Sequence, residues 1–239
     1  MKLFTVSVLS ILLLTGMIAP TSAQQSVDKR DSLALVAMYR ATGGENWRES
    51  WDMNLPVDLW SGVSVNNGRV TSLILRSNNL TGSLPDEVGK LAELTSFDVS
   101  NNRLIGQIPY GFSQLSHLVL LNLSGNSLNG EIPPALANLG NLQNLFLGNN
   151  QLSGNIPREL GNLGQLKQLA LDNNQLSGTL PHELGNLRNL VFFSASNNQL
   201  EGTVPESFAN LRNLRGLGLS DNLIEQSVLE RWSQILLRR

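Results

Sequence analysis

The stretch LQNLFLGNNQLSGNIP, residues 142–157, contains the pattern that decides the fold. Its apolar positions Leu142, Leu145 and Leu147 are followed by Asn150 and then by a Leu-x-Gly-x-Ile-Pro sequence. The same frame returns 24 residues later and 24 residues earlier, without an insertion or a deletion. A spacing this strict is the signature of a solenoid, in which each repeat is one supersecondary unit stacked on the previous one.

The asparagine is the most regular position of the repeat. It occurs in seven copies, at Asn78, Asn102, Asn126, Asn150, Asn174, Asn198 and Asn222. Six copies add a glycine and, three residues after it, a proline, from Gly82 and Pro85 to Gly202 and Pro205. The alternation of Leu145 and Leu147 predicts a half-buried strand, and the spacing of Leu160 and Leu163 predicts a short helix on the outer side. The pattern therefore predicts an α/β repeat solenoid.

The complete pattern LxxLxLxxNxLxGxIPxxLxxL resembles the plant-type leucine-rich repeat, from Val70 to about Ile224. The resemblance implies a leucine-rich repeat superhelix with a parallel concave β-sheet and short convex helices or 3₁₀ turns. It also implies that the asparagines form an internal ladder. An amide side chain offers both a donor and an acceptor to buried backbone groups that need partners. We therefore interpret the seven asparagines as structural; a sugar- or peptide-binding role is the alternative.

Four segments are predicted along the chain. Residues 1–23 have the features of a signal peptide, because Lys2 precedes an apolar stretch that ends in small residues at Ala23. The remaining segments are an N-terminal cap over 24–69, seven repeats over 70–222 with the last one incomplete, and a C-terminal capping helix over 223–239. The apolar run is short for a membrane span. The mature chain is therefore expected to be secreted or extracellular, at the cell surface or in a bacterial periplasm, without an integral membrane span.

The N-terminal cap is expected to contain a helix and a hairpin. Asp31 is predicted to cap the helix, which is stopped by Gly43-Gly44. Its inner face is predicted to carry Leu33, Val36, Ala37 and Tyr39 or Arg40. Asn67-Gly68 is the turn signal of the hairpin. Large aromatic residues seal cores well, so we expect cap packing rather than ligand binding from Trp47, Trp51 and Trp60.

The chain has no cysteine, so its ends must be capped by packing alone. Asp58 and Val65 stand at the two cysteine positions of the plant cap motif CxWxGVxC. The segment 41–47 is similar to the cysteine-free caps of bacterial and algal leucine-rich repeat proteins. At the other end, Gln226 and Leu229 replace the glycine and the proline, and an amphipathic helix is predicted over 223–237.

Composition and motifs argue against several classes of function. The formal net charge is −2 and no basic stripe is present, so a nucleic-acid partner is not expected. His117 and His182 lie in different repeats, without neighbours that would form a catalytic triad or a metal site. No phosphate loop, dinucleotide fingerprint or zinc-helix motif is present. We therefore expect no catalysis, no cofactor and no metal.

The outward positions of the predicted concave face are the candidates for partner binding. Most are small and polar, but Phe146 and Phe192 flank Ala170, and exposed aromatic residues rimmed by polar groups are typical of binding hot spots. The alternative is that each ring only covers its neighbouring strands. The expected partner-binding residues are Asn144, Phe146, Lys167, Gln168, Asp172, Phe192, Asp98 and Arg76.

The size of this face restricts the partner. Seven strands about 4.8 Å apart give a strip about 30 Å long and about 10 Å wide. Its few hundred Å² fall short of the roughly 800 Å² per partner of a standard stable interface. A peptide or a protruding loop fits the strip, whereas a full protein partner also needs the lateral edges. Asn79 and Asn122 are candidate glycosylation sites in a eukaryotic secretory pathway, and a glycan on Asn122 would block part of the strip.

Three hypotheses of function follow. The first is a secreted, non-catalytic protein that binds a protein or peptide through its concave face; the resemblance implies cell-surface recognition, adhesion or defence signalling. The second is an inhibitor of a secreted polysaccharide hydrolase, similar to the polygalacturonase-inhibiting proteins of this repeat type. The third is a structural module that self-associates or attaches to an envelope. The sequence does not decide the oligomeric state.

Overall fold

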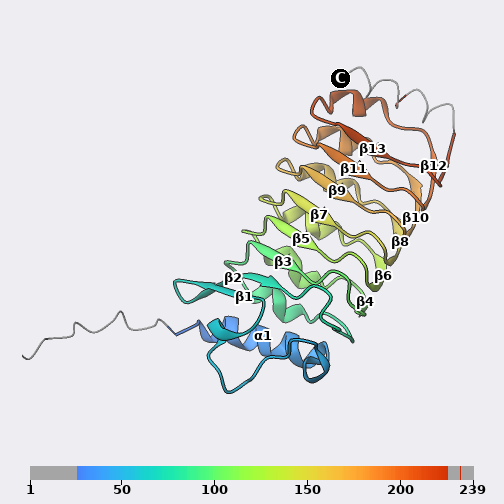
Figure 1. Ribbon diagram of the computed structural model, residues 1–239. Coiled ribbons are helices and arrows are strands. Elements are labelled where there is room, and N and C mark those ends of the chain that lie inside the picture. The colour runs from blue at the N-terminus through green and yellow to red at the C-terminus, as the bar shows by residue number, and fades with distance from the viewer. Residues whose placement is uncertain (1–25, 226–231, 233–239) are drawn as a thin grey trace, which may run out of the picture.

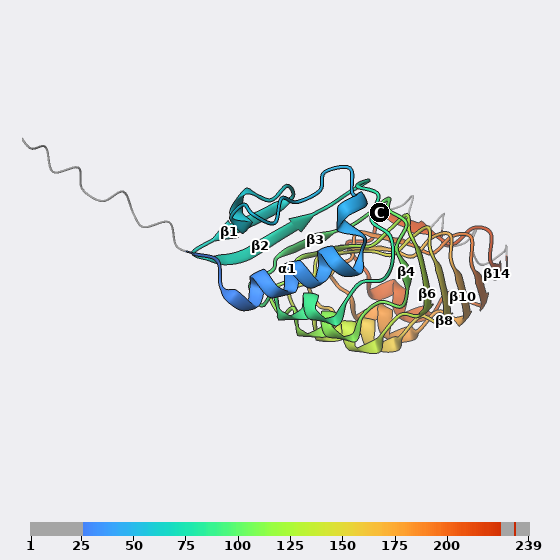
Figure 2. The same ribbon diagram turned by 90° about the horizontal axis from the view of Figure 1, so that it is seen from below.

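The repeats stack along one axis in the computed structural model, which describes residues 26–225 and Trp232 (Figure 1). Successive repeats contribute strands to two sheets, and short 3₁₀ helices lie opposite the first sheet (Figure 2). Helix α1 (Lys29–Ala41) lies across the N-terminal end of the stack. The predicted α/β leucine-rich repeat solenoid is therefore confirmed.

The larger sheet, called the concave sheet below, takes strands from the cap and from each repeat. In order across the described sheet, they are β1 Val63–Asn66, β2 Arg69–Ile74, β3 Ser96–Asp98, β5 Leu120–Asn122, β7 Asn144–Phe146, β9 Gln168–Ala170, β11 Phe192–Ser194 and β13 Gly216–Gly218. All neighbours are parallel except β1 and β2. Equivalent positions pair, so Leu145 lies between Leu121 and Leu169. Outward side chains therefore form straight rows along the solenoid.

The second sheet, called the lateral sheet, is formed by the segments that follow the ladder asparagine of each repeat. Its described strands are β4 Ile105–Gly106, β6 Ser127–Glu131, β8 Gln151–Asn155, β10 Gln175–Thr179, β12 Gln199–Gly202 and β14 Leu223–Ile224. The 3₁₀ helices of the repeats are Asp86–Lys90, Tyr110–Gln114, Pro134–Asn138, Arg158–Asn162, His182–Asn186 and Glu206–Asn210. A proline stands at the N-cap of each of these helices, where its fixed φ suits the start of a turn.

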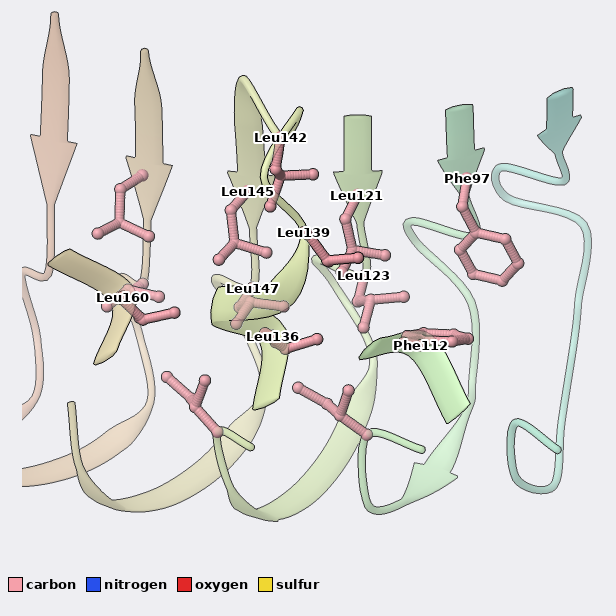
Figure 3. Packing of buried hydrophobic residues seen from close by; sticks show 14 of the residues in the cluster. Phe97, Phe112, Leu121, Leu123, Leu136, Leu139, Leu142, Leu145, Leu147 and Leu160 are labelled. Carbon is pink, nitrogen blue, oxygen red and sulfur yellow. The ribbon is translucent and has the colours of Figure 1, made fainter. Parts of the chain in front are cut away.

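The core is a continuous stack of leucines between the concave sheet and the 3₁₀ helices. Leu145 and Leu147 point from the sheet side toward Leu136 and Leu139 of the convex side, and all four are fully buried (Figure 3). A repeat cannot bury this face alone, so each one depends on its neighbours for its core. Burial of a leucine side chain stabilises by about 1.5–3 kcal/mol, which makes this stack the main source of stability.

The repeated asparagines form a ladder of hydrogen bonds inside the solenoid. Asn150 Nδ2 donates to the carbonyl of Leu147 at 3.1 Å and to that of Leu123, in the preceding repeat, at 3.0 Å. Asn150 Oδ1 accepts from the N–H of Leu128 at 3.0 Å. Asn78 has no complete repeat before it, and its Oδ1 accepts from the N–H of Glu49 in the cap at 2.7 Å. The amides therefore satisfy backbone groups that the buried turns would leave unpaired.

Helix α1 begins one turn earlier than predicted. Its N-cap is Asp28, whose carboxylate accepts from the N–H of Arg30 at 2.7 Å, so the prediction of Asp31 as the cap is wrong. The predicted inner face is wrong at Leu33, which is 58% exposed, whereas Val36 and Tyr39 are partly buried against the core. The buried face instead carries Asp31, Ala34, Leu35 and Met38. Asp31 is a fully buried carboxylate on this face, and an ion-pair partner on the neighbouring strand accounts for its burial.

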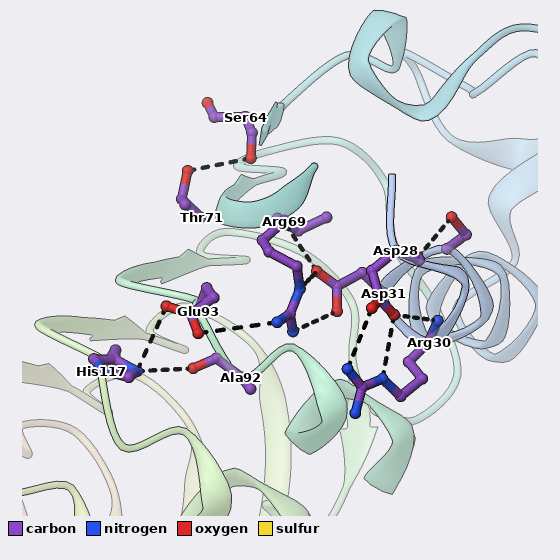
Figure 4. A network of polar contacts seen from close by, with 11 residues as sticks. Asp28, Arg30, Asp31, Ser64, Arg69, Thr71, Ala92, Glu93 and His117 are labelled. Atoms are coloured by element: carbon purple, nitrogen blue, oxygen red, sulfur yellow. Dashed lines mark hydrogen bonds and ion pairs between the residues drawn. The ribbon is translucent and has the colours of Figure 1, made fainter. Parts of the chain in front are cut away.

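That partner is Arg69, at the start of β2 (Figure 4). Its Nε and one terminal nitrogen each lie 3.0 Å from an oxygen of Asp31, and the N–H of Val70 donates to the same carboxylate at 2.8 Å. The hydrogen bonds to Asp31 raise the pKa of Arg69 above its ordinary value. Arg69 also lies 3.9 Å from Glu93, and Glu93 lies 3.9 Å from His117. Polar contacts therefore join the cap to the first three strands of the repeats.

Three tryptophans fill the rest of the cap. Trp51 stacks on Trp60 with ring centroids 4.7 Å apart and meets Trp47 edge-on at 4.8 Å. All three rings are buried, and the indole N–H of Trp47 donates to the carbonyl of Thr42 at 2.9 Å. In the hairpin, Asn67 and Gly68 both have positive φ, at 48° and 70°, as a two-residue turn between β1 and β2 requires.

The C-terminal end differs from the prediction at its boundary. Leu223 and Ile224, expected to begin the capping helix, form β14 and pair with β12. Trp232 is helical and buried, and its ring lies 6.3 Å from that of Phe208. The predicted signal peptide and the rest of the predicted capping helix lie outside the described residues.

Candidate functional site

The outward rows of the concave sheet change character along the solenoid. At the N-terminal end, the row that begins with Ile74 continues with Asp98 and Asn122, which are polar. It then becomes apolar at Phe146 and Ala170. The neighbouring row ends at Phe192 and Gly216. The pairing of equivalent positions therefore brings Phe146 and Phe192 close together on the C-terminal half of the sheet, while the apolar outward side chains of Ile74 and Leu120 lie on the N-terminal half.

A pocket of about 400 Å³ lies on this half. Its lining residues come from four adjacent strands, β7, β9, β11 and β13: Phe146, Gln168, Leu169, Ala170, Phe192, Phe193, Ser194, Gly216, Leu217 and Gly218. The lining is mostly apolar, and Phe192 is 50% exposed. The volume is within the range of ordinary ligand pockets and exceeds what one side chain fills. Of the predicted site residues, this pocket brings together Phe146, Gln168 and Phe192.

Two glycines make room for the pocket on β13. A Cβ at residue 216 would stand 2.7 Å from Cδ1 of Phe192, and a Cβ at residue 218 would stand 2.5 Å from the hydroxyl oxygen of Ser194. A side chain at residue 216 would therefore displace the Phe192 ring, and one at residue 218 would crowd Ser194. Gly216 and Gly218 occupy outward positions of the concave sheet but are not among the predicted site residues. The signal that could have identified them was the absence of a side chain at two successive outward positions.

Asp172 stands at one rim of the pocket. Its Oδ1 accepts a hydrogen bond from the hydroxyl of Ser194, which lines the pocket, and another from the N–H of Ser196 at 3.1 Å. Lys167 and Asn144 lie just outside the lining. Lys167 donates from Nζ to Oε1 of Gln143 at 2.9 Å, and Asn144 is the strand neighbour of Gln168.

Arg76 and Asp98, also predicted for the site, form a separate cluster at the other end of the sheet. Arg76 Nε donates to Asp98 Oδ2 at 2.7 Å, and Asn122 Nδ2 donates to the same oxygen at 2.9 Å. Asp98 Oδ1 accepts from the backbone and the hydroxyl of Ser100, at 3.0 and 2.7 Å. The Asp98 side chain has no exposed surface, although an outward, partner-facing position was expected. Neighbouring donors cover it, because Asn122 is its partner on β5 and Arg76 follows its other partner, Ile74, by two residues.

The two glycosylation candidates differ in their surroundings. Asn79 lies beside the N-terminal cap, and its Nδ2 donates to the carbonyl of Asn46 at 2.8 Å. Asn122 belongs to the Asp98 cluster, and its Oδ1 accepts from the hydroxyl of Ser124 at 2.7 Å.

The two histidines of the chain lie apart from each other and from any cluster of acidic side chains in the described part of the chain. Within residues 26–225 and Trp232, no group of three or more His, Cys, Asp or Glu side chains is placed to hold a metal ion. His117 lies 3.0 Å from the carbonyl of Ala92, and His182 lies 3.4 Å from Glu183 beside it in sequence. In the same part of the chain, no helix combines the length and the apolar character needed to cross a membrane.

Comparisons with known proteins agree with this architecture. Residues 71–179 match the family model described as Leucine-rich repeat region, and residues 189–211 match the model Leucine Rich Repeat. The chain is 34% identical over 92 residues to Polygalacturonase inhibitor 2 of Arabidopsis thaliana, a match that covers 37% of this chain. The chain spans only 10% and 28% of the lengths of the two curated relatives that it matches.

Solved structures extend the similarity over most of the chain. A plant ice-binding protein is 30% identical with a TM-score of 0.75, and the match covers 84% of this chain and 73% of that one. The ectodomain of the receptor kinase GASSHO1/SCHENGEN3 of Arabidopsis thaliana, solved in complex with CASPARIAN STRIP INTEGRITY FACTOR 2, is 34% identical with a TM-score of 0.69. That match covers 85% of this chain and 28% of the receptor. With its 24-residue repeats, its paired concave positions and its asparagine ladder, the chain belongs to the plant-type leucine-rich repeat family.

Proposed function

We propose that this chain is a secreted, non-catalytic recognition protein that binds an extended peptide, or a protruding loop of a protein, on its concave sheet. The observation that carries the proposal is the apolar pocket of about 400 Å³ between Phe146 and Phe192 on the concave sheet. Binding energy concentrates where an apolar anchor fills a desolvated pocket and polar contacts surround it. The pocket binds the apolar anchor of the ligand, and the polar outward side chains around it make the surrounding contacts.

The shape of the site favours a narrow ligand. The pocket spans four strands, which corresponds to about 15 Å along the solenoid axis. The volume accepts one large apolar side chain with part of its backbone. A ligand of this kind agrees with the similarity to a receptor ectodomain that was solved in complex with a separate factor. A role in cell-surface recognition, adhesion or defence follows from the same family relationship.

Selection of peptides displayed on phage against the immobilised chain tests the proposal. We expect the enriched peptides to share a large apolar residue and to bind at least about tenfold more weakly to the Phe146→Ala/Phe192→Ala double variant. The matched control is Tyr110→Ala, which removes an aromatic ring that is 69% exposed on a convex helix. Binding to this control should equal binding to the unaltered chain.

Two outcomes would contradict the proposal. Equal affinity of the enriched peptides for the double variant would place their binding outside the pocket. Selection without enrichment, together with concentration-dependent sedimentation of the chain, would favour the structural self-associating module instead.

Inhibition of a secreted polysaccharide hydrolase is the second candidate, favoured by the 34% identity to Polygalacturonase inhibitor 2. A whole enzyme would need more area than the concave strip offers, so its contacts would extend to the lateral edges. The direct test is the release of reducing ends from polygalacturonate by a fungal polygalacturonase, with and without equimolar chain. Unchanged release over a panel of such enzymes would reject this candidate.

The similarity to a plant ice-binding protein warrants one separate measurement. The lateral sheet exposes short hydroxyl and amide side chains in a repeating order, among them Ser153, Ser177 and Thr179, which can hold ordered water. Inhibition of ice recrystallisation by the chain, weakened by a Ser153→Lys/Ser177→Lys variant, would assign that activity to this sheet. Growth of ice at the rate of a buffer control would exclude it.

A further inference from the structure

Asp172 at the rim of the pocket uses only one of its two carboxylate oxygens. Oδ1 accepts from the hydroxyl of Ser194 and from the N–H of Ser196. Within residues 26–225 and Trp232, no donor reaches Oδ2 and no cation forms an ion pair with this carboxylate. The oxygen is therefore available to a donor that comes from outside the chain.

Asp98, on the same sheet, shows what a completed arrangement looks like. One of its oxygens accepts from a serine hydroxyl and a backbone N–H, as in Asp172. Its other oxygen accepts from the guanidinium of Arg76 at 2.7 Å and from the amide of Asn122 at 2.9 Å. Among residues 26–225 and Trp232, a cation thus pairs with Asp98 and none pairs with Asp172.

We propose that the partner supplies this missing cation: a guanidinium or ammonium group, carried close to the apolar residue that enters the pocket, pairs with Asp172. The proposal rests on the proposed function and names the chemistry of its ligand. The partner is a peptide segment with a large apolar residue and a basic residue one or two positions away.

The spacing of the sheet fits such a pair. Ala170 lines the pocket and Asp172 lies two residues further along the same extended segment, at a distance of about 7 Å. Residues i and i+2 of an extended peptide span the same distance on one face. Gly148 occupies the position equivalent to Asp172 in the preceding repeat, the repeat of Phe146. It has no side chain, so nothing from that position covers the carboxylate.

The charges on the opposite rim limit how basic the ligand can be. Lys167 and Arg215 stand at the starts of β9 and β13, on the other side of the pocket from Asp172, and both are exposed. A uniformly basic segment would meet like charges there, which is unfavourable. A single cationic group beside the apolar residue can pair with Asp172 on one rim and stay away from Lys167 and Arg215 on the other.

Synthetic probe peptides test the proposal on the full chain. The first probe is acetyl-Gly-Gly-Phe-Gly-Arg-Gly-Gly-amide, and a second one places Phe and Arg side by side. In matched peptides, citrulline replaces Arg to remove the charge, or Gly replaces Phe to remove the anchor. Binding is followed by NMR through the amide signals of Gly216 and Gly218, in the pocket, and of Ser196, whose N–H donates to Asp172.

We expect at least one arginine peptide to bind about two- to fivefold more tightly than its citrulline analogue at low salt, the size of an exposed ion pair. The preference should disappear in Asp172→Asn, which keeps an acceptor for Ser194 and Ser196. It should persist in Asp221→Asn, the matched control, because Asp221 is an exposed carboxylate that does not line the pocket.

The remaining outcomes separate the two proposals. Binding that requires Phe but shows no preference for Arg would overturn the role of Asp172 and leave the pocket assignment intact. A preference for Arg that survives in Asp172→Asn would overturn it as well. If no peptide shifts Gly216 or Gly218, or if replacing Phe has no effect, both the proposed function and this inference fail.

Discussion

A single ladder asparagine connects three backbone segments. The side chain of Asn150 bonds the carbonyls of Leu123 and Leu147 and the N–H of Leu128, so it joins its own repeat to the preceding one. No other side chain of similar size offers two donors and an acceptor at these angles. In the interior, an unmade hydrogen bond costs more than a made one contributes. The position is therefore occupied by asparagine in all seven copies.

Replacement of this side chain should destabilise the fold. We expect Asn150→Ala to lower the free energy of unfolding by about 2–3 kcal/mol, because the N–H of Leu128 loses its acceptor in a buried turn. Gln151→Ala, at the next and exposed position, is the control and should change it by less than about 0.5 kcal/mol. Urea denaturation followed by circular dichroism measures both. Equal stability of the two variants would contradict the structural role.

The N-cap of α1 provides a residue whose titration reports a local contact. Hydrogen bonds from the side chain and backbone of Arg30 lower the pKa of Asp28 from 3.8 to about 2. Because the pKa is depressed in the folded chain, any stability from this contact is present above about pH 4 and is lost as the pH falls toward 2.

A pH titration of the Asp28 carboxyl carbon by NMR checks this expectation. The midpoint should lie near 2 in the unaltered chain and rise toward 3.8 in Arg30→Gln, which removes the charged donor. A midpoint that does not respond to Arg30→Gln would show that this side chain is not the cause.

At the scale of elements, the convex helices set how closely neighbouring repeats approach. In the helix Arg158–Asn162, Gly161 lies against the next convex helix, and a Cβ there would stand 2.3 Å from the carbonyl oxygen of Glu183. Backbone cannot give way as a flexible side chain can. Between these two helices the absence of a side chain at Gly161 therefore avoids a clash with the backbone of Glu183, whereas Gly164 has no neighbour within 4 Å of its own added Cβ.

These two glycines form a matched pair for mutation. We expect Gly161→Ala to lower the free energy of unfolding by about 1–3 kcal/mol through overpacking against Glu183. Gly164→Ala should leave it unchanged or raise it by up to about 1 kcal/mol, because alanine restricts the unfolded chain. Thermal unfolding of both variants under the same conditions measures the two changes in stability. Similar losses in both would mean that the contact between convex helices is not tight.

At the scale of the whole molecule, stability is a sum over repeats and their interfaces. Each repeat contacts its neighbours through the leucine stack, the asparagine ladder and both sheets, so the solenoid tolerates changes in the number of units better than changes in their length. The cap is different, because Asp31, Arg69 and the three tryptophans close the first repeat in one particular way.

Deletion of one complete unit tests this property. Removing residues 103–126 joins Asn102 to Ser127 in frame, so we expect a folded chain with the same type of circular dichroism spectrum and a smaller urea m-value. The control deletion, residues 105–126, removes 22 residues and shifts the frame by two positions. It should abolish cooperative unfolding. A well-folded control would mean that the repeat length is not under strict constraint.

Much of this molecule was predictable from its sequence. The 24-residue period determined the solenoid, because one register of strand, turn and helix repeats without error and each unit needs a neighbour to bury its leucines. The same period determined which side chains face outward, since strand residues alternate between the two faces. The hairpin turn at Asn67-Gly68 was also predictable, because two adjacent residues specify it. These features depend on contacts within one repeat or between equivalent positions of two.

Only the tertiary structure decided what lies beyond the period. Asp31 belongs to the buried face of α1 because Arg69, 38 residues away, pairs with it, and no local pattern contains that distance. Phe146 and Phe192 were predicted to share the outward face, but the pocket between them also depends on Gly216, which lies beside Phe192 on the adjacent strand and has no side chain to fill the space. Likewise, Asp98 is covered by Arg76 and Asn122, while Asp172 keeps a free oxygen. Such differences arise because stacking brings together side chains at positions whose residue type changes from repeat to repeat. The repeat pattern describes only the positions whose residue type stays the same.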